Sequence, residues 1–330
     1  MVDPPLVSII MPVRNGMPYL TDTLESILNQ TYEHWELIVI NDHSEDGTEI
    51  TLTTYAHQDD RISYHNATGR GIIDALRQGY AGSVGSYITR MDADDLMPMQ
   101  KIERLLHAAK RDLNTVSTGY VKYFKDQGIA DGYRRYEEWL NSLCDSNSHF
   151  SDIYKECVIP SPCWMMHRSA FERIGSFDST TYPEDYDLAF RMYKHGLSVN
   201  PVLETLHLWR DHDERASRND VHYKDNRFLD LKLHYFVSLE CSPDQEVLLI
   251  GAGKKGKYIA KGLLSHNIPF RWFTNNLKKV NHNIYGTILS SVDNLSSCEY
   301  TKCIVAVANR KEQNDITAHY GDMLDLVFFV

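Results

Sequence analysis

Short apolar segments alternate with amphipathic ones along the first part of the chain. LVSIIMPV (6–13), WELIVIN (35–41) and SYITRMD (86–92) each have the composition of a buried strand. The segments between them repeat apolar residues at helical spacing, as Leu20 and Leu24 do. Strands that are apolar at nearly every position and alternate with helices predict a mainly parallel sheet covered by helices.

Stretches with polar, charged and turn-forming residues lie at the carboxyl ends of these strands. They are Pro12–Gly16, Asn41–Asp46 and Asp92–Asp95. In open sheets of this class ligands bind beyond the carboxyl ends of the strands. The coincidence therefore predicts a ligand site along one edge of the sheet.

The third stretch, ITRMDADDLMP (88–98), crowds Asp92, Asp94 and Asp95 into four positions. Carboxylates this close repel one another unless a cation lies between them. Asp92 and Asp94 could ligate one hard divalent ion, Mg²⁺ or Mn²⁺, whose open positions a substrate's phosphate oxygens would fill. A solvated acidic turn is the alternative, and the position at a strand end favours the ion.

Composition and charge limit the class of partner. The 330 residues suit two domains. The formal charge, 34 − 45 = −11, argues against nucleic acid as the main partner, because phosphate backbones are bound by clusters of Lys and Arg. A small substrate that carries phosphate stays compatible, provided that a metal or a local basic patch supplies positive charge.

The cysteines and the apolar runs indicate the cellular compartment of the protein. The six cysteines include no CxxC pair, which suits a reducing compartment. The first residues, MVDPPLVSIIMPVRNG, lack the basic region of a signal peptide, and no run approaches the ~18 apolar residues that cross a bilayer. We expect a soluble, cytoplasmic protein.

Several motifs in matching order and spacing resemble one enzyme family. They are VSIIMPVRNGMPYLTDTLESILNQTYEHWELIVINDHSEDGT, GIIDALRQGYAGSVGSYITRMDADDLMP, PSPCWMMHRSAFERIGSFD, PEDYDLAFRMYKHG and LWRDHDERAS. The chain resembles the family 2 glycosyltransferases over about residues 5–218. The resemblance implies the GT-A fold, a nucleotide-diphospho-sugar donor, a DxD metal site and inversion of the anomeric centre. The QxxRW signature of processive synthases is absent, which favours the addition of single sugars.

The resemblance also implies roles at the donor site. Asp42 would hydrogen-bond the base or ribose, although Asn41 stands where the family often has another acid. Asp94 would ligate a metal that bridges the two phosphates, and Asp95 would cap the next turn or orient its neighbours. The donor-binding positions carried over are Pro12, Val13, Arg14, Asn15, Asp42, Arg70, Gly71, Asp92 and Ala93.

Glu184 and Asp185 begin a predicted helix. The resemblance assigns Asp185 as the base that deprotonates the acceptor hydroxyl. A carboxylate at a helix start can do this if its pKa and its reach are suitable. From the residues alone, both could simply be first-turn acids that the helix dipole favours.

The segment WRDHDERASRND (209–220) matches a family loop that closes over the donor. Arg210 and Arg215 could neutralise the diphosphate, and His212 could add a metal ligand. A solvated loop of mixed charge is the alternative. Trp164, with Glu184, could line the sugar or acceptor pocket, and an aromatic core role for Trp164 is equally compatible with the sequence.

The alternating order restarts after a break near residues 242–245. VLLIGAGKKGKYIAKGLL places Gly251, Gly253 and Gly256 as GxGxxG between a predicted strand and helix, the context of a phosphate-binding turn. The region resembles the small Rossmann-like N-terminal domain of bacterial sugar acyltransferases. It could serve packing or oligomerisation, bind a nucleotide-linked ligand, or bind NAD. The expected domains are 1–240, with a nucleotide half at about 1–112 and an acceptor half at about 113–240, and 243–330.

The leading interpretation is a hexosyltransferase-type, metal-dependent inverting glycosyltransferase that uses UDP-sugar. From the family alone, the acceptor would be a glycan or a lipid-linked saccharide in bacterial surface glycan biosynthesis. One alternative is a nucleotide-sugar-binding or NAD-binding protein, or an oxidoreductase, centred on the C-terminal GxGxxG. Another is a catalytically inactive nucleotide-sugar sensor. Peripheral contact with the inner face of a membrane, and a homo-oligomer, stay open.

Overall fold

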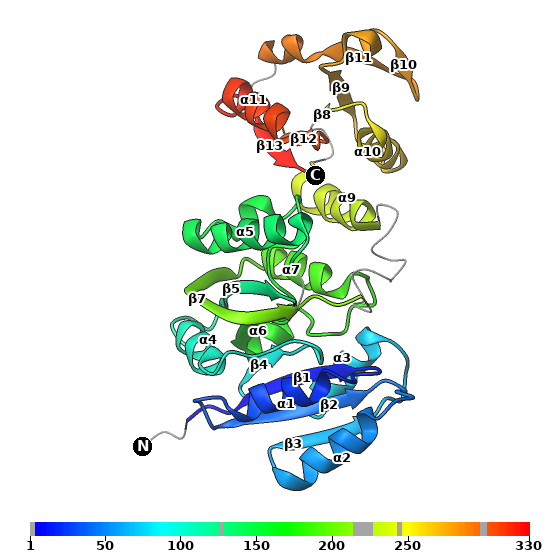
Figure 1. The fold of residues 1–330 in the computed structure, drawn as a ribbon. Coiled ribbons are helices and arrows are strands. Elements are labelled where there is room, and N and C mark those ends of the chain that lie inside the picture. Colours follow the sequence, from blue (N-terminus) through cyan, green and yellow to red (C-terminus); the bar gives the residue numbers. More distant parts are fainter. Residues whose placement is uncertain (1–3, 126–127, 214–226, 243–245, 298–301) are drawn as a thin grey trace. The chain divides into compact units, whose positions relative to one another are not determined.

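The computed structural model describes residues 4–125, 128–213, 227–242, 246–297 and 302–330 (Figure 1). By its internal contacts the chain forms two compact units. The first consists of Met1–Phe150 and Val158–Arg215, and the second of Ser151–Cys157 and Ala216–Val330. None of the described helices combines the length and apolarity that crossing a membrane requires.

The first unit is built on a seven-stranded sheet of order β3-β2-β1-β4-β6-β5-β7. Strands β1 to β4 are parallel, and β6 runs antiparallel to both of its neighbours, β4 and β5. The expected α/β class and mainly parallel sheet are therefore confirmed. The strands are β1 (Val7–Val13), β2 (Trp35–Asn41), β3 (Ile62–Asn66), β4 (Tyr87–Arg90), β5 (Thr115–Phe124), β6 (Trp164–His167) and β7 (Ser198–Arg210).

Helices pack against this sheet through their apolar faces. Helix α3 contacts β1 and β2, and α4 contacts β5, β6 and β7. The approach of α3 requires a small residue, because a Cβ on Gly79 would lie 2.7 Å from Ile10 Cγ2. The helices are α1 (Leu20–Leu28), α2 (Thr48–Gln58), α3 (Ile72–Ala81), α4 (Lys101–Ala109), α5 (Asp131–Ser146), α6 (Arg168–Arg173) and α7 (Glu184–Lys194), and a short 3₁₀ helix, η1 (His149–Asp152), follows α5.

The second unit has a six-stranded sheet of order β10-β11-β9-β8-β12-β13, and all of its strands are parallel except β10. This confirms a second α/β domain. Helix α9, which we expected at the end of the first domain, groups with this unit. The elements are α9 (Arg227–Glu240), β8 (Val247–Ile250), α10 (Lys254–Ser265), β9 (Phe270–Thr274), η3 (Leu277–Lys279), β10 (Asn283–Ile284), β11 (Thr287–Ser291), η4 (Val292–Ser297), β12 (Lys302–Val305), α11 (Arg310–Tyr320) and β13 (Asp325–Phe328).

Candidate functional site

The parallel pairing of β1, β2 and β4 brings their carboxyl ends to one edge of the first sheet. Val13 pairs with Asn41 in register, and the Asp42 amide donates to the Val13 carbonyl at 2.7 Å. The loops after β1 and β2 are also joined. Asn15, with φ 51°, donates its amide to Ser44 Oγ at 2.8 Å and accepts the Glu45 amide through Oδ1 at 2.9 Å.

Burial differs within the first of these loops. Val13 is buried, Pro12 is half-buried, and Arg14 and Asn15 are exposed. The polar side chains of this predicted donor loop therefore face solvent, whereas its apolar residues anchor it to the sheet. Their contact with a nucleotide stays a prediction.

Asp42 holds the loop that precedes α3. One carboxylate oxygen, Oδ2, accepts the Gly71 amide at 2.9 Å, and Gly71 adopts φ 87°, which favours glycine. Arg70 precedes it, and its amide donates to Asp74 Oδ2 at 3.2 Å. The second oxygen of Asp42, Oδ1, is buried and accepts no hydrogen bond from the described residues. A buried carboxylate oxygen is stable only with a donor, so this oxygen suits an N–H or O–H of a ligand.

Arg90, at the end of β4, connects the acidic turn (Asp92–Asp95) to α7. Its guanidinium donates to Asp92 Oδ1 at 2.8 Å and to Glu184 Oε1 at 3.0 Å, and its side chain is 4% exposed. Although burial alone would lower the Arg90 pKa, the facing carboxylates hold that pKa above its ordinary value. The side chains of Asp92 and Glu184 are therefore fixed by one buried cation.

Asp94 meets His212 across the acidic turn. Asp94 Oδ2 lies 2.9 Å from His212 Nε2, and His212 Nδ1 is buried without a hydrogen-bond partner among the described residues. The 2.9 Å distance is that of a hydrogen bond, and a carboxylate and an imidazole are both donor groups that could hold a divalent ion. No group of three His, Cys, Asp or Glu side chains within the described ranges forms a complete metal site.

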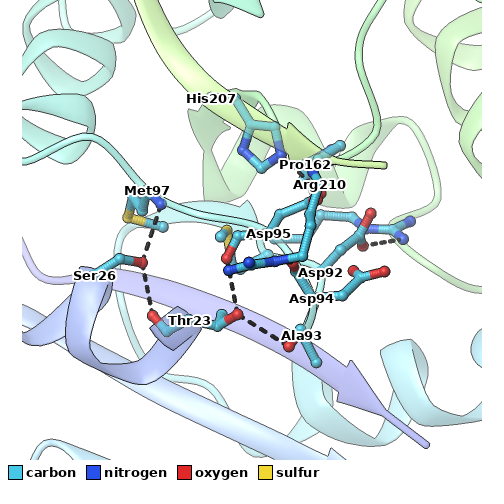
Figure 2. Close-up of polar contacts among 12 residues, drawn as sticks. Thr23, Ser26, Asp92, Ala93, Asp94, Asp95, Met97, Pro162, His207 and Arg210 are labelled. Carbon is cyan, nitrogen blue, oxygen red and sulfur yellow. Dashed lines mark hydrogen bonds and ion pairs between the residues drawn. The ribbon is translucent and has the colours of Figure 1, made fainter. Parts of the chain in front are cut away.

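The main chain of the acidic turn is held by α1 (Figure 2). Thr23 Oγ1 lies 3.0 Å from the Ala93 carbonyl and 2.8 Å from that of Asp95. Ser26 Oγ accepts the Met97 amide at 3.0 Å. Helix α1 thus fixes the backbone that presents Asp92 and Asp94. Ala93 contributes to the site with its backbone, whose carbonyl Thr23 contacts.

Arg210 closes the other side of the turn. Its Nε donates to the Asp94 carbonyl at 2.9 Å and its Nη2 to Asp22 Oδ2 at 3.0 Å, while the guanidinium lies 4.8 Å from the ring centroids of Tyr19 and Phe124. These contacts make Arg210 a structural clamp beside Asp94. The diphosphate contact that we expected of it stays a prediction.

Asp185 is half-buried at the start of α7. Burial, reinforced by the adjacent Glu184 carboxylate and opposed by Arg90, raises the pKa of Asp185 to about 7. A carboxylate with this pKa is ionised in part near neutral pH and binds a proton firmly enough to act as a general base. The side chain of Glu184 is 11% exposed, and its Oε2 is buried without a hydrogen-bond partner in the described part of the chain.

Trp164, an expected site residue, is part of the core. Trp164 is 1% exposed and packs with Phe171 and Phe177 at ring-centroid distances of 5.7 and 6.5 Å, so it has the core role that the sequence left open. Arg215 lies outside the described residues.

The C-terminal GxGxxG forms a tight turn from β8 into α10. Gly251 adopts φ 111°, and a Cβ on Gly256 would lie 2.0 Å from the Gly251 carbonyl oxygen. That oxygen accepts Trp272 Nε1 at 2.8 Å, and Gly253 is the N-cap of α10. The first and third glycines are required by the turn itself, whereas a Cβ on Gly253 would meet no atom within 4 Å.

Sequence reasoning missed the residues that hold the site in place. Arg90 was visible as an arginine inside an apolar strand, SYITRMD, directly before the acids. Thr23 and Ser26 carry no such signal, because polar residues in a helix are usually solvated. His207, 112 positions from Asp95, becomes relevant only through the fold, and Lys101 becomes relevant through its contact with His207.

In sequence, the chain is similar to known glycosyltransferases. The sequence model described as Glycosyl transferase family 2 matches residues 8–175, about half of the chain. A relative from Haemophilus influenzae, described as an uncharacterized glycosyltransferase, is 31% identical over 224 residues, which are 64% of this chain and 68% of the relative. The putative teichuronic acid biosynthesis glycosyltransferase TuaG of Bacillus subtilis is 28% identical over 219 residues, which are 65% and 82% of the two chains.

Among solved structures, Staphylococcus aureus TarS (residues 1–349) in complex with UDP-GlcNAc superposes with a TM-score of 0.52 at 14% identity. The match covers 72% of this chain and 68% of that one. At this identity the likeness establishes a shared fold.

Proposed function

This chain belongs to glycosyltransferase family 2, and on that premise we propose that it transfers a hexose from a nucleotide-diphospho-sugar to a hydroxyl acceptor with inversion at the anomeric carbon. One observation carries the proposal. The carboxyl edge of the parallel strands has Asp42 after β2 and Asp94 after β4, and Arg90 at the same edge bonds to Glu184, the neighbour of Asp185. A nucleotide contact, a diphosphate contact and a base are the groups that such a transfer needs.

UDP-sugar is the proposed donor. The solved structure of similar fold holds UDP-GlcNAc. Asp42 Oδ1, buried without a hydrogen-bond partner among the described residues, would accept a hydrogen bond from the base or the ribose. The exposed Arg14 and Asn15 and the glycine turn at Gly71 would border the same nucleotide.

Asp94 and His212 would hold a divalent ion, Mg²⁺ or Mn²⁺, with the donor's phosphate oxygens completing its coordination. Such an ion stabilises the negative charge of the departing diphosphate. The chain's own part is to keep these two side chains facing each other, which Thr23 and Arg210 do through the backbone of the acidic turn.

Asp185 is the proposed base. Its carboxylate takes the proton of the acceptor hydroxyl while that oxygen bonds to the anomeric carbon, and the bond from this carbon to the diphosphate oxygen breaks with its electron pair on the diphosphate. The raised pKa, about 7, allows Asp185 to hold the proton after transfer. Arg90 donates a hydrogen bond to the neighbouring Glu184 carboxylate.

The proposed acceptor is a saccharide hydroxyl of a growing bacterial surface glycan, free or lipid-linked. TuaG, a relative named for teichuronic acid biosynthesis, supports this class of product. Transfer at the cytoplasmic face of a membrane would suit a lipid-linked acceptor.

Nucleotide binding tests the donor half of this proposal. UDP, GDP, CDP and NAD would be titrated calorimetrically with Mn²⁺ present, against wild type, Asp42→Ala and the exposed control Asp60→Asn. We expect UDP to bind most tightly, and Asp42→Ala to weaken it by about 10- to 100-fold, the loss of a hydrogen bond to a charged group. Preferential binding of NAD, or no nucleoside diphosphate bound, would contradict the proposal.

A further inference from the structure

A buried chain of polar side chains lies behind the acidic turn. Asp95 Oδ2 lies 2.9 Å from His207 Nε2, and His207 Nδ1 lies 3.0 Å from Lys101 Nζ. None of the three side chains is more than 1% exposed. Burying an acid and a base so completely is costly unless each is paired, so the arrangement requires an explanation beyond packing.

The contacts define the role of each atom in this chain. Because an ionised carboxylate only accepts, His207 Nε2 carries the hydrogen that bonds to Asp95, and the neutral ring's Nδ1 accepts from Lys101. Lys101 also donates to the Pro162 carbonyl at 2.6 Å. The histidine therefore connects Lys101 to Asp95, and every member has a partner.

The same carboxylate ties the acidic turn to the end of β7. Asp95 Oδ1 accepts the Arg210 amide at 2.8 Å, while Leu96 and Leu208 exchange backbone hydrogen bonds of 3.0 and 3.1 Å. Figure 2 shows His207 and Arg210 beside Asp95. Two residues after Arg210 comes His212, and directly before Asp95 comes Asp94. The spacing between these two side chains thus depends on the position of Asp95.

We propose that Lys101 and His207 are positioning residues of the donor site: through Asp95 they fix the acidic turn against the end of β7 and so hold Asp94 and His212 at ligand distance. This inference rests on the proposed function for its chemical meaning. Neither residue touches the donor, and both act through Asp95. Groups that orient metal ligands in this way typically contribute about 10- to 100-fold to metal affinity.

The test uses the full chain and four variants. Lys101→Met removes the ammonium at similar length, and Lys110→Met makes the same change at an exposed position at the end of the same helix. His207→Leu removes both hydrogen bonds. His207→Gln keeps an N–H for Asp95 and an acceptor for Lys101, so it is the conservative variant.

The first readout is Mn²⁺ affinity in the presence of UDP, from the free Mn²⁺ signal in electron paramagnetic resonance. Lys101→Met and His207→Leu should weaken it about 10- to 100-fold, with His207→Gln closer to wild type and Lys110→Met unchanged. UDP binding in EDTA should stay within about twofold in all four, because Asp42 and Gly71 lie on other loops. A loss of both bindings together would mean general damage and would overturn the positioning role.

The second readout needs no ligand. Backbone hydrogen exchange of peptides covering 92–97 and 207–212 should accelerate in Lys101→Met and His207→Leu, and not in Lys110→Met. If wild type released no nucleotide from any sugar donor while these exchange effects appeared, the proposed function would fail and the positioning role would stand. If Lys101→Met did not fold, the His207 pair decides: equal affinity for Mn²⁺ in the Gln and Leu variants overturns the proposal.

Discussion

The imidazole of His212 lies 2.9 Å from the carboxylate of Asp94, although 118 positions separate them in the chain. Asp94 follows β4, the middle strand of the sheet, and His212 follows β7, an edge strand. The contact exists because Arg210 and Asp95 lock the two segments together. A two-residue site assembled in this way makes the metal proposal testable one side chain at a time.

Replacing either member of the pair should weaken metal binding. We expect Asp94→Ala and His212→Ala each to lower Mn²⁺ affinity by at least about tenfold, and the double variant to lose less than the sum of the two free energies, because they share one ion. Electron paramagnetic resonance of free Mn²⁺ measures this. The control is Asp213→Asn, at an exposed acid near the same loop. Fully additive losses would indicate independent sites.

The pH dependence of turnover should report Asp185. Because this carboxylate must be ionised to accept a proton, and its pKa is about 7, kcat should rise with pH and level off above about pH 8. Glu184→Gln removes the neighbouring negative charge that helps to raise this pKa, so the acid limb should move to lower pH. The kcat profile of both proteins measures this. An unmoved limb would mean that another group titrates.

The ionisation of Asp185 should lower the stability of the folded protein over the same pH range in which it raises activity. Its folded-state pKa lies above the ordinary value of 3.8, so the folded protein binds the proton more tightly than the unfolded chain and loses stability as pH rises from about 4 to 7. Asp185→Asn removes this penalty. We expect a higher Tm than wild type at pH 8 and a vanishing difference near pH 4, measured by thermal denaturation. A lower Tm at pH 8 would contradict the assigned burial.

Arg90 should be costly to replace. Arg90→Met leaves Asp92 and Glu184 without their buried cation, so we expect a loss of about 3–5 kcal/mol in the free energy of unfolding. Arg104→Met is the matched control, because its pair with Glu204 is exposed at the surface and should contribute under about 1 kcal/mol. Urea denaturation measures both. Equal losses would show that the Arg90 pairs contribute no more than a surface contact.

How far the sequence predicts this protein depends on the range of the interactions. The strands around Ile9, Ile38 and Ile88 are apolar on both faces, so their burial and parallel pairing follow from local pattern. The acids stood out because they directly follow these apolar strands. The seventh strand and the antiparallel β6 had no periodic signal, since the chain between 115 and 215 has irregular loops.

Side-chain partners across the site were less accessible to sequence reasoning. The residue type of Trp164 does not distinguish a core role from a pocket role. Only its burial shows the core role. From the sequence alone, Lys101 is a polar residue at the start of an amphipathic helix. In the structure its Nζ bonds to His207, 106 positions away. Such pairs depend on which strands of the sheet lie near one another, and short-range sequence patterns do not specify this.

The most direct measurement is nucleotide release from a panel of nucleotide-sugars, with Mn²⁺ or Mg²⁺ and a saccharide acceptor, by wild type, Asp94→Ala, Asp185→Asn and Asp60→Asn. We predict release of UDP that depends on both metal and acceptor. It should fall by about 10²–10⁴-fold in Asp185→Asn, as expected for loss of a general base, fall strongly in Asp94→Ala, and stay unchanged in Asp60→Asn. Transfer at the wild-type rate in both Asp94→Ala and Asp185→Asn would contradict the account.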